Sequence, residues 1–162
     1  YLASQQQLGS GEPPKEDWLL AGLIHDFDYG GEFKNEHPFK LQEALKKYHL
    51  EITPTVENII HAHAASHFNI TPSNKAEWAI YCADSLTGLI MAVAYVYPSR
   101  KLADVKTPSV VKRFLKAPNF AAGTRRNEVV ECNKPEGLNI PLEKFIEICL
   151  VSMQKTASTI GV

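Results

Sequence analysis

Imidazole and carboxylate side chains gather where an apolar stretch near the beginning of the sequence ends. In AGLIHDFDYG, residues 21–30, His25 and Asp26 follow the apolar run directly and Asp28 comes two positions later. A helix end or a turn needs one carboxylate at most. Imidazole and carboxylate together form the ligand set of a borderline or hard divalent metal ion. The stretch therefore predicts metal chemistry where a buried helix reaches the surface.

Further histidines follow on later segments of the chain. His37 stands before a proline, and His61, His63 and His67 lie within the apolar-patterned segment IIHAHAASHF. An isolated histidine on a helix is usually a surface residue or a core residue with its hydrogen bonds made. That ordinary interpretation weakens when several histidines stand beside carboxylates on successive helices. His67 comes one helical turn after His63 and shares its face, whereas His61 faces elsewhere and is not a candidate.

Asp84 is a carboxylate inside a segment that is otherwise apolar enough to be core, YCADSLTGLI. Burial of an unpaired carboxylate costs several kcal/mol unless a cation or strong donors satisfy it. A metal ion would satisfy Asp84. The alternative is an ordinary one, in which Asp84 caps a neighbouring helix or accepts hydrogen bonds from Ser85 or Thr87. The residues alone leave both open.

Periodic apolar patterns predict helices along the whole chain, so the expected fold class is all-α, a compact helical bundle of one domain over residues 1–162. No alternating strand pattern exceeds four residues. Proline and acidic residues at the first positions mark several helix starts. The expected helices cover residues 13–26, 38–50, 53–68, 71–97, 107–116 and 141–159, with the last turns of another over 1–7 and a loop over 29–37.

Composition narrows the function classes. The 162 residues carry a net charge of −1, so no overall field indicates nucleic acid or an acidic membrane as partner. Three cysteines without C-x-x-C spacing argue against a disulfide framework and for a cytoplasmic protein. No apolar run reaches the roughly 18 residues that a membrane span needs. The oligomeric state cannot be read from the sequence.

The order of these motifs resembles a known family. GLIHDFDY, EHPFK, IIHAHA, YCADSLTGLIMAVAYVYPSRKL and PSVVKRFLKAPNFAAGTRR are similar to a bacterial branch of the HD-domain superfamily of metal-dependent phosphohydrolases, described as predicted hydrolases. The similarity runs from about Trp18 to beyond Arg126. It implies a helical HD domain and metal-assisted hydrolysis of a phosphate ester, in which the ion lowers the pKa of water and polarises a phosphoryl oxygen.

The resemblance also implies a ligand set. His25 and Asp26 match adjacent ligands of one ion and Asp84 matches the ligand that completes its set, while His37 and His63 match positions that hold a second ion in two-metal members. One or two divalent ions are therefore expected, chosen among Mn, Fe, Ni, Zn and Mg. The superfamily's first ligand is a histidine on the preceding helix, and no histidine precedes His25. We expect it upstream of Tyr1; a protein without it would lack a ligand.

Two residues are candidates for catalytic roles. Asp28 could orient a metal-bound water or hold a ligand histidine through its second ring nitrogen. A turn-forming aspartate before Gly30 is an equally good interpretation of Asp28. His67 is a candidate contact to the substrate or to a metal ligand.

A basic segment could bind the phosphate of a substrate. Between Ser99 and Arg126 the chain has eight Lys or Arg residues and one acid. Negative charge that develops on phosphoryl oxygens is stabilised by fixed cations, and the candidates are Lys112, Arg113, Lys116 and Arg126, with Arg125 beside them. A solvated basic helix face is the more common interpretation of such a cluster.

Three functions remain on these grounds. The first is a cytoplasmic phosphohydrolase acting on a small phosphorylated metabolite such as a nucleotide. The second is a non-catalytic HD domain that binds metal or nucleotide as a regulatory module. The third, a nucleic-acid binder, has little support because only Phe114 and Phe120 are interleaved with the basic residues. We therefore expect neither nucleic acid nor a membrane as partner.

Overall fold

The computed structural model describes residues 11–160, and the side chains of residues 11–157. Within that part the secondary structure is helical throughout and contains no strand, which confirms the all-α class. The chain forms two compact units, here called the N-terminal unit (residues 11–81) and the C-terminal unit (residues 82–160). The single-domain expectation stays a prediction, and the helix expected over 1–7 lies outside the described residues.

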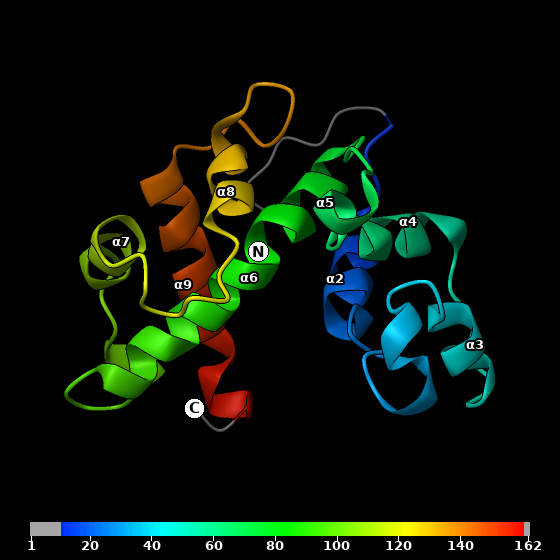
Figure 1. Cartoon of the computed structure of the whole chain (residues 1–162), viewed down its shortest axis with the longest axis horizontal. Coiled ribbons are helices and arrows are strands. Elements are labelled where there is room, and N and C mark those ends of the chain that lie inside the picture. Colours follow the sequence, from blue (N-terminus) through cyan, green and yellow to red (C-terminus); the bar gives the residue numbers. More distant parts are fainter. Residues whose placement is uncertain (1–10, 161–162) are drawn as a thin grey trace. The chain divides into compact units, whose positions relative to one another are not determined.

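The N-terminal unit is built on two helices that pack against each other, α2 (Lys15–Ile24) and α4 (Pro54–Ala62) (Figure 1). Ala21 of α2 is buried in one apolar cluster with Val56, Ile59 and Ile60 of α4. Thr53 begins α4 by accepting a hydrogen bond from Val56 N through its hydroxyl, and Pro54 occupies the first turn, where a missing N–H costs nothing.

Shorter elements complete this unit. The 3₁₀ helix η1 (Gly31–Glu36) occupies the segment expected as loop, and α3 (Leu41–Lys46) buries Leu41 and Leu45 in the same cluster as α2 and α4. The helix expected over 53–68 is divided into α4 and α5 (Ala65–Phe68). Asn69 ends α5 in the left-handed conformation, φ 55°, which asparagine tolerates better than most residues.

The long helix α6 (Lys75–Val96) belongs to both units. A reciprocal cap begins it, because Asn74 Oδ1 accepts from Glu77 N and the Glu77 carboxylate accepts from the Asn74 side chain. Among the described helices it is the one whose length and apolar composition suffice to cross a bilayer. Leu86, Leu89 and Ile90 are nonetheless fully buried, as in the core helix of a folded domain.

In the C-terminal unit α7 (Thr107–Lys116) packs on α9 (Leu142–Ile160) (Figure 1). Val110 and Phe114 of α7 are buried, as are Phe145 and Ile146 of α9. The short elements η2 (Leu102–Asp104), α8 (Arg126–Val129) and η3 (Val130–Asn133) connect the longer helices. The boundaries of α7 are those expected from the sequence, whereas α8 was not predicted.

Candidate metal centre

The ends of three helical elements bring three potential ligands together. Asp26 follows α2, His37 follows η1 and His63 ends α4. One ligand atom from each lies within 4.8 Å of the other two, so this set, here called the His–Asp group, could hold a metal ion. The resemblance had assigned Asp26 to a first ion and the two histidines to a second. The structure places all three in one group.

The separations within the His–Asp group suit a common ion. His37 Nε2 lies 2.9 Å from His63 Nε2 and 3.4 Å from Asp26 Oδ1, and His63 Nε2 lies 4.0 Å from Asp26 Oδ1. Two donors that are each about 2.1 Å from one ion lie about 3.0 Å apart at a right angle and about 3.4 Å apart at the tetrahedral angle. The observed distances bracket these values.

Hydrogen bonds to the other ring nitrogens fix which nitrogen faces the group. His37 Nδ1 lies 2.6 Å from Asp28 Oδ1, and His63 Nδ1 lies 2.5 Å from the Ile60 carbonyl oxygen. A carboxylate and a carbonyl only accept, so both Nδ1 atoms are donors. In the neutral form, each ring therefore carries its lone pair on Nε2, and these two Nε2 atoms face each other. Two lone pairs at that separation repel unless a proton or a cation lies between them, so the donor set fits a metal ion.

His25 is oriented in the same way as the two histidines of the group. Its Nδ1 lies 3.0 Å from the Gly22 carbonyl oxygen, and its Nε2 lies 3.5 Å from Asp26 Oδ2. Its ring contacts the His63 ring edge-on, with centroids 5.3 Å apart. Gly22 and Ile60 each lie in the last turn of a helix, where carbonyl groups lack the i+4 backbone donor of a continuing helix, and the Ile60 carbonyl also accepts from His63 N at 3.1 Å. That is why a histidine just after each helix end is held by Nδ1.

Asp28 is a supporting residue for the group. Its side chain is 0% exposed and accepts from the Lys40 backbone N–H, 3.1 Å from Oδ2, as well as from His37 Nδ1. The sequence left open whether Asp28 orients a water, holds a histidine or forms a turn. The contacts with His37 and Lys40 show that it holds the histidine.

Access to the His–Asp group is one-sided. The side chains of His37 and His63 are 9% and 6% exposed, whereas that of Asp26 is 57% exposed. A bound ion would therefore be enclosed on the imidazole side and reachable from the carboxylate side. Such an arrangement leaves coordination positions for water or substrate.

His61 lies apart from the group, as the sequence predicted. Its ring packs on Phe39, with centroids 4.6 Å apart, and its Nε2 is buried without a hydrogen-bond partner in the described part of the chain. Burial lowers the pKa of His61, against an opposing effect of the nearby Glu57 carboxylate. Burial thus disfavours the charged imidazole in the folded state.

Asp84 lies in the C-terminal unit, on α6. Its Oδ2 accepts from Arg125 Nη2 at 2.7 Å, and Arg125 Nε also donates to the buried Glu128 at 2.6 Å. Thr87 donates to the backbone carbonyl of Asp84 rather than to its carboxylate. The guanidinium is one of the strong donors that the ordinary interpretation of Asp84 requires. Its role as a metal ligand stays a prediction.

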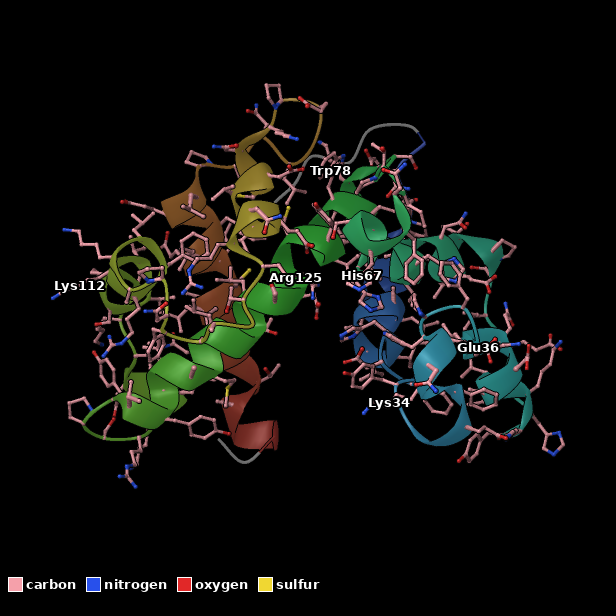
Figure 2. All side chains as sticks on the ribbon, viewed as in Figure 1. Lys34, Glu36, His67, Trp78, Lys112 and Arg125 are labelled. Atoms are coloured by element: carbon pink, nitrogen blue, oxygen red, sulfur yellow. The ribbon has the colours of Figure 1, made fainter. Side chains whose placement is uncertain are left out.

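The predicted phosphate-binding residues fall into two kinds. Lys112 and Lys116 are exposed, and Lys112 projects from the outer side of α7 (Figure 2). Arg126 instead donates to three backbone carbonyls, those of Phe114, Ala117 and Phe120, at 2.6–3.2 Å. These bonds satisfy carbonyls at the end of α7 and in the loop that follows.

Arg126 therefore has a structural role at the end of α7, and the phosphate binding that the sequence suggested for it stays a prediction. Arg113 is partly used in the same way, because its Nη1 lies 3.3 Å from the Ser109 carbonyl oxygen and its guanidinium lies over the Phe120 ring. Phosphate binding by Lys112, Arg113 and Lys116 stays a prediction. So does a catalytic role for His67, an exposed residue of α5 whose ring contacts Phe68 (Figure 2).

Comparisons with known proteins found no match to this chain. No protein-family model matches the chain. No curated protein and no solved structure matches it either. The HD-domain resemblance therefore depends on the quoted motifs alone, and the metal-binding capacity of the His–Asp group depends on its geometry.

Proposed function

We propose that the protein is a metal-dependent phosphohydrolase that acts on a small phosphorylated molecule. The observation that carries the proposal is the convergence of Asp26 Oδ1 with two imidazole Nε2 atoms whose Nδ1 atoms are both held as donors. The order of the HD, HP and HAHA motifs supports hydrolysis of a phosphate ester as the reaction. Imidazole-rich sets favour Zn, Mn, Fe or Ni over Mg.

The chain's own residues have defined tasks in this proposal. His37 and His63 present fixed lone pairs to the ion, and Asp28 keeps His37 in the required tautomer. Asp26 supplies a negative charge on the solvent side. A divalent ion bound there would lower the pKa of water and polarise a phosphoryl oxygen. His25, held beside Asp26, is the next imidazole that could take part as ligand or proton carrier.

The test measures the metal content and the hydrolysis of phosphate esters for the purified protein and for Asp26→Ala. Elemental analysis should find a stoichiometric divalent ion in the native protein and a loss of it in the variant, with helix content unchanged. Glu16→Ala, an exposed carboxylate in the first turn of α2, is the matched control. A screen of phosphorylated metabolites with Mn, Ni, Mg and Zn then identifies the substrate. Unchanged metal content in Asp26→Ala contradicts the proposal.

The same measurements decide the remaining alternatives. A stoichiometric ion without turnover of any phosphate ester would favour the non-catalytic regulatory module. Asp84→Asn tests the ligand predicted in the C-terminal unit: a metal ligand there would make the variant bind metal more weakly. If Asp84 serves only to balance the Arg125 charge, the variant loses stability and keeps its metal affinity.

A further inference from the structure

Tyr29 lies directly against a member of the His–Asp group. Its ring contacts the His37 ring edge-on, with centroids 5.1 Å apart and an interplanar angle of 82°. Tyr29 is 55% exposed, so one part of the phenol packs on the ligand and the rest meets solvent. Its hydroxyl makes no hydrogen bond within the described residues. A phenol in this position can donate to a group bound beside His37.

Lys34 brings a positive charge to the same place. Its Nζ lies over the Tyr29 ring, 5.6 Å from the centroid. Two neighbouring lysines are paired with carboxylates, Lys40 with Glu36 and Glu43, and Lys47 with Glu32. Lys34 forms no ion pair in the part of the chain that the structure describes. Lys34 and Glu36 project from different sides of η1 (Figure 2).

Among the described residues, an ammonium without a carboxylate partner and a phenol without a hydrogen-bond partner are thus linked to the His–Asp group by consecutive contacts, from Lys34 to the Tyr29 ring and from that ring to His37. An ammonium over an aromatic ring is often only a surface contact of modest energy. Here the same ring also contacts His37, so the Tyr29 ring connects the cation to the candidate metal site. Both features favour negative charge, and a tetrahedral oxyanion could bridge them.

We propose that Tyr29 and Lys34 form an oxyanion site beside the His–Asp group, which takes the phosphate of a phosphate monoester. The inference rests on the proposed function, which supplies a phosphate ester as the class of substrate. It assigns the phosphate-binding role to the N-terminal unit. Lys34 supplies charge to the nonbridging oxygens, and the Tyr29 hydroxyl donates one hydrogen bond. Neither residue holds the ion itself.

The experiment titrates inorganic phosphate into the full chain by calorimetry, once with Mn²⁺ present and once with chelator. Lys34→Met removes the charge and keeps an unbranched side chain that is one atom shorter. Tyr29→Phe removes the hydroxyl and keeps the ring on His37. Lys46→Met, an exposed lysine of α3, is the control. We expect Lys34→Met to weaken phosphate binding about tenfold and Tyr29→Phe a few-fold, as for a charge-assisted and a neutral hydrogen bond.

Separate measurement of Mn²⁺ affinity keeps the two proposals distinguishable. Both variants should bind Mn²⁺ as the native protein does, and Lys34→Arg should restore most of the phosphate affinity. Equal phosphate affinities of native protein, Lys34→Met and Lys46→Met would overturn the oxyanion site, as would the absence of phosphate binding in both conditions. A protein that binds no metal overturns the proposed function alone, since phosphate binding that depends on Lys34 in chelator still supports the oxyanion site.

Discussion

The environment of a single carboxylate, Asp28, explains how His37 becomes a candidate ligand. A fully buried carboxylate is stable only with strong donors, and Asp28 has two, the Lys40 backbone N–H and His37 Nδ1. The first fixes the carboxylate to the beginning of α3. The second fixes the imidazole tautomer, so the His37 lone pair faces the His–Asp group.

Replacement of Asp28 by asparagine should therefore weaken metal binding without removing a ligand. The asparagine oxygen can still accept from Lys40 N, which turns the amide NH₂ toward His37 Nδ1. The ring must then carry its proton on Nε2, where it opposes the ion. We expect metal affinity to fall about 10- to 100-fold. Calorimetric titration measures this, and nitrogen NMR of the imidazole reports the tautomer.

Glu43→Gln is the control for Asp28→Asn, because Glu43 is an exposed carboxylate that pairs with Lys40 through its side chain. It should leave both metal affinity and the His37 tautomer unchanged. If Asp28→Asn shows native affinity with the tautomer reversed, then His37 is not a ligand.

The sequence predicted residue types at the site better than it predicted their grouping. Asp26, His37 and His63 were all candidate ligands, since imidazoles and carboxylates recur after apolar segments. The tautomers of His37 and His63 depend on which carboxylate or carbonyl oxygen contacts each Nδ1, and only the folded chain defines that contact. Lys34 was not predicted as a site residue, because a single lysine in a polar segment forms no recognisable sequence pattern.

At the level of secondary structure, Arg126 stabilises the end of α7. It donates to the carbonyls of Phe114, Ala117 and Phe120 and lies over the Phe114 ring, 5.6 Å from its centroid. Arg126→Met should lower the free energy of unfolding by about 2 kcal/mol, because several carbonyls lose a charged donor. Lys112→Met on the exposed face should change it by less than about 0.5 kcal/mol. Urea denaturation compares them, and equal stabilities would contradict the structural role of Arg126.

Three buried thiols on different elements predict a dependence of stability on alkaline pH. Burial raises the pKa of Cys132 to about 11 and that of Cys149 to about 12, and it raises the pKa of Cys82 further. A thiol ionises near pH 8.5 in the unfolded chain. The unfolded state therefore loses protons first, and the stability present below pH 8.5 is lost as pH rises toward the folded-state pKa values.

The change should be measurable by urea unfolding at pH 7.5 and pH 10. For Cys149 alone the expected loss over that range is about 2 kcal/mol. Cys149→Ala should therefore show a smaller decrease with pH than the native protein, whatever its stability at pH 7.5. An identical decrease in both proteins would mean that Cys149 is not protected from ionisation by burial.

Most helices could be predicted from the sequence, and the exceptions have local causes. The period of apolar residues continues from α4 through α5, but the chain departs from helical geometry at Ala64, φ −107° and ψ 17°, so the expected single helix is divided. The short helix α8 covers four residues, RNEV, too few to show a period. Its place depends on contacts such as Arg125 with Glu128, which a sequence pattern does not reveal.

At the scale of the whole molecule, charge and potential function are distributed unevenly. The basic segment over residues 99–126 belongs to the C-terminal unit, while the His–Asp group and Lys34 belong to the N-terminal unit. A ligand that binds only the folded state stabilises the part of the chain that holds it. Metal binding is therefore a probe of the N-terminal unit in the intact protein.

We expect a divalent ion at 100 times its dissociation constant to stabilise the native protein by about 2.7 kcal/mol. Hydrogen exchange should show the gain in the amides of α2 and α4, whose ends carry Asp26 and His63. The amides of α7 and α9 serve as the comparison within the same sample. In Asp26→Ala the gain should be lost while the exchange of the metal-free protein stays as in the native chain. Equal protection of α2 and α4 with and without metal would mean that the ion binds elsewhere, because a ligand cannot stabilise helices whose ends it joins without slowing their opening.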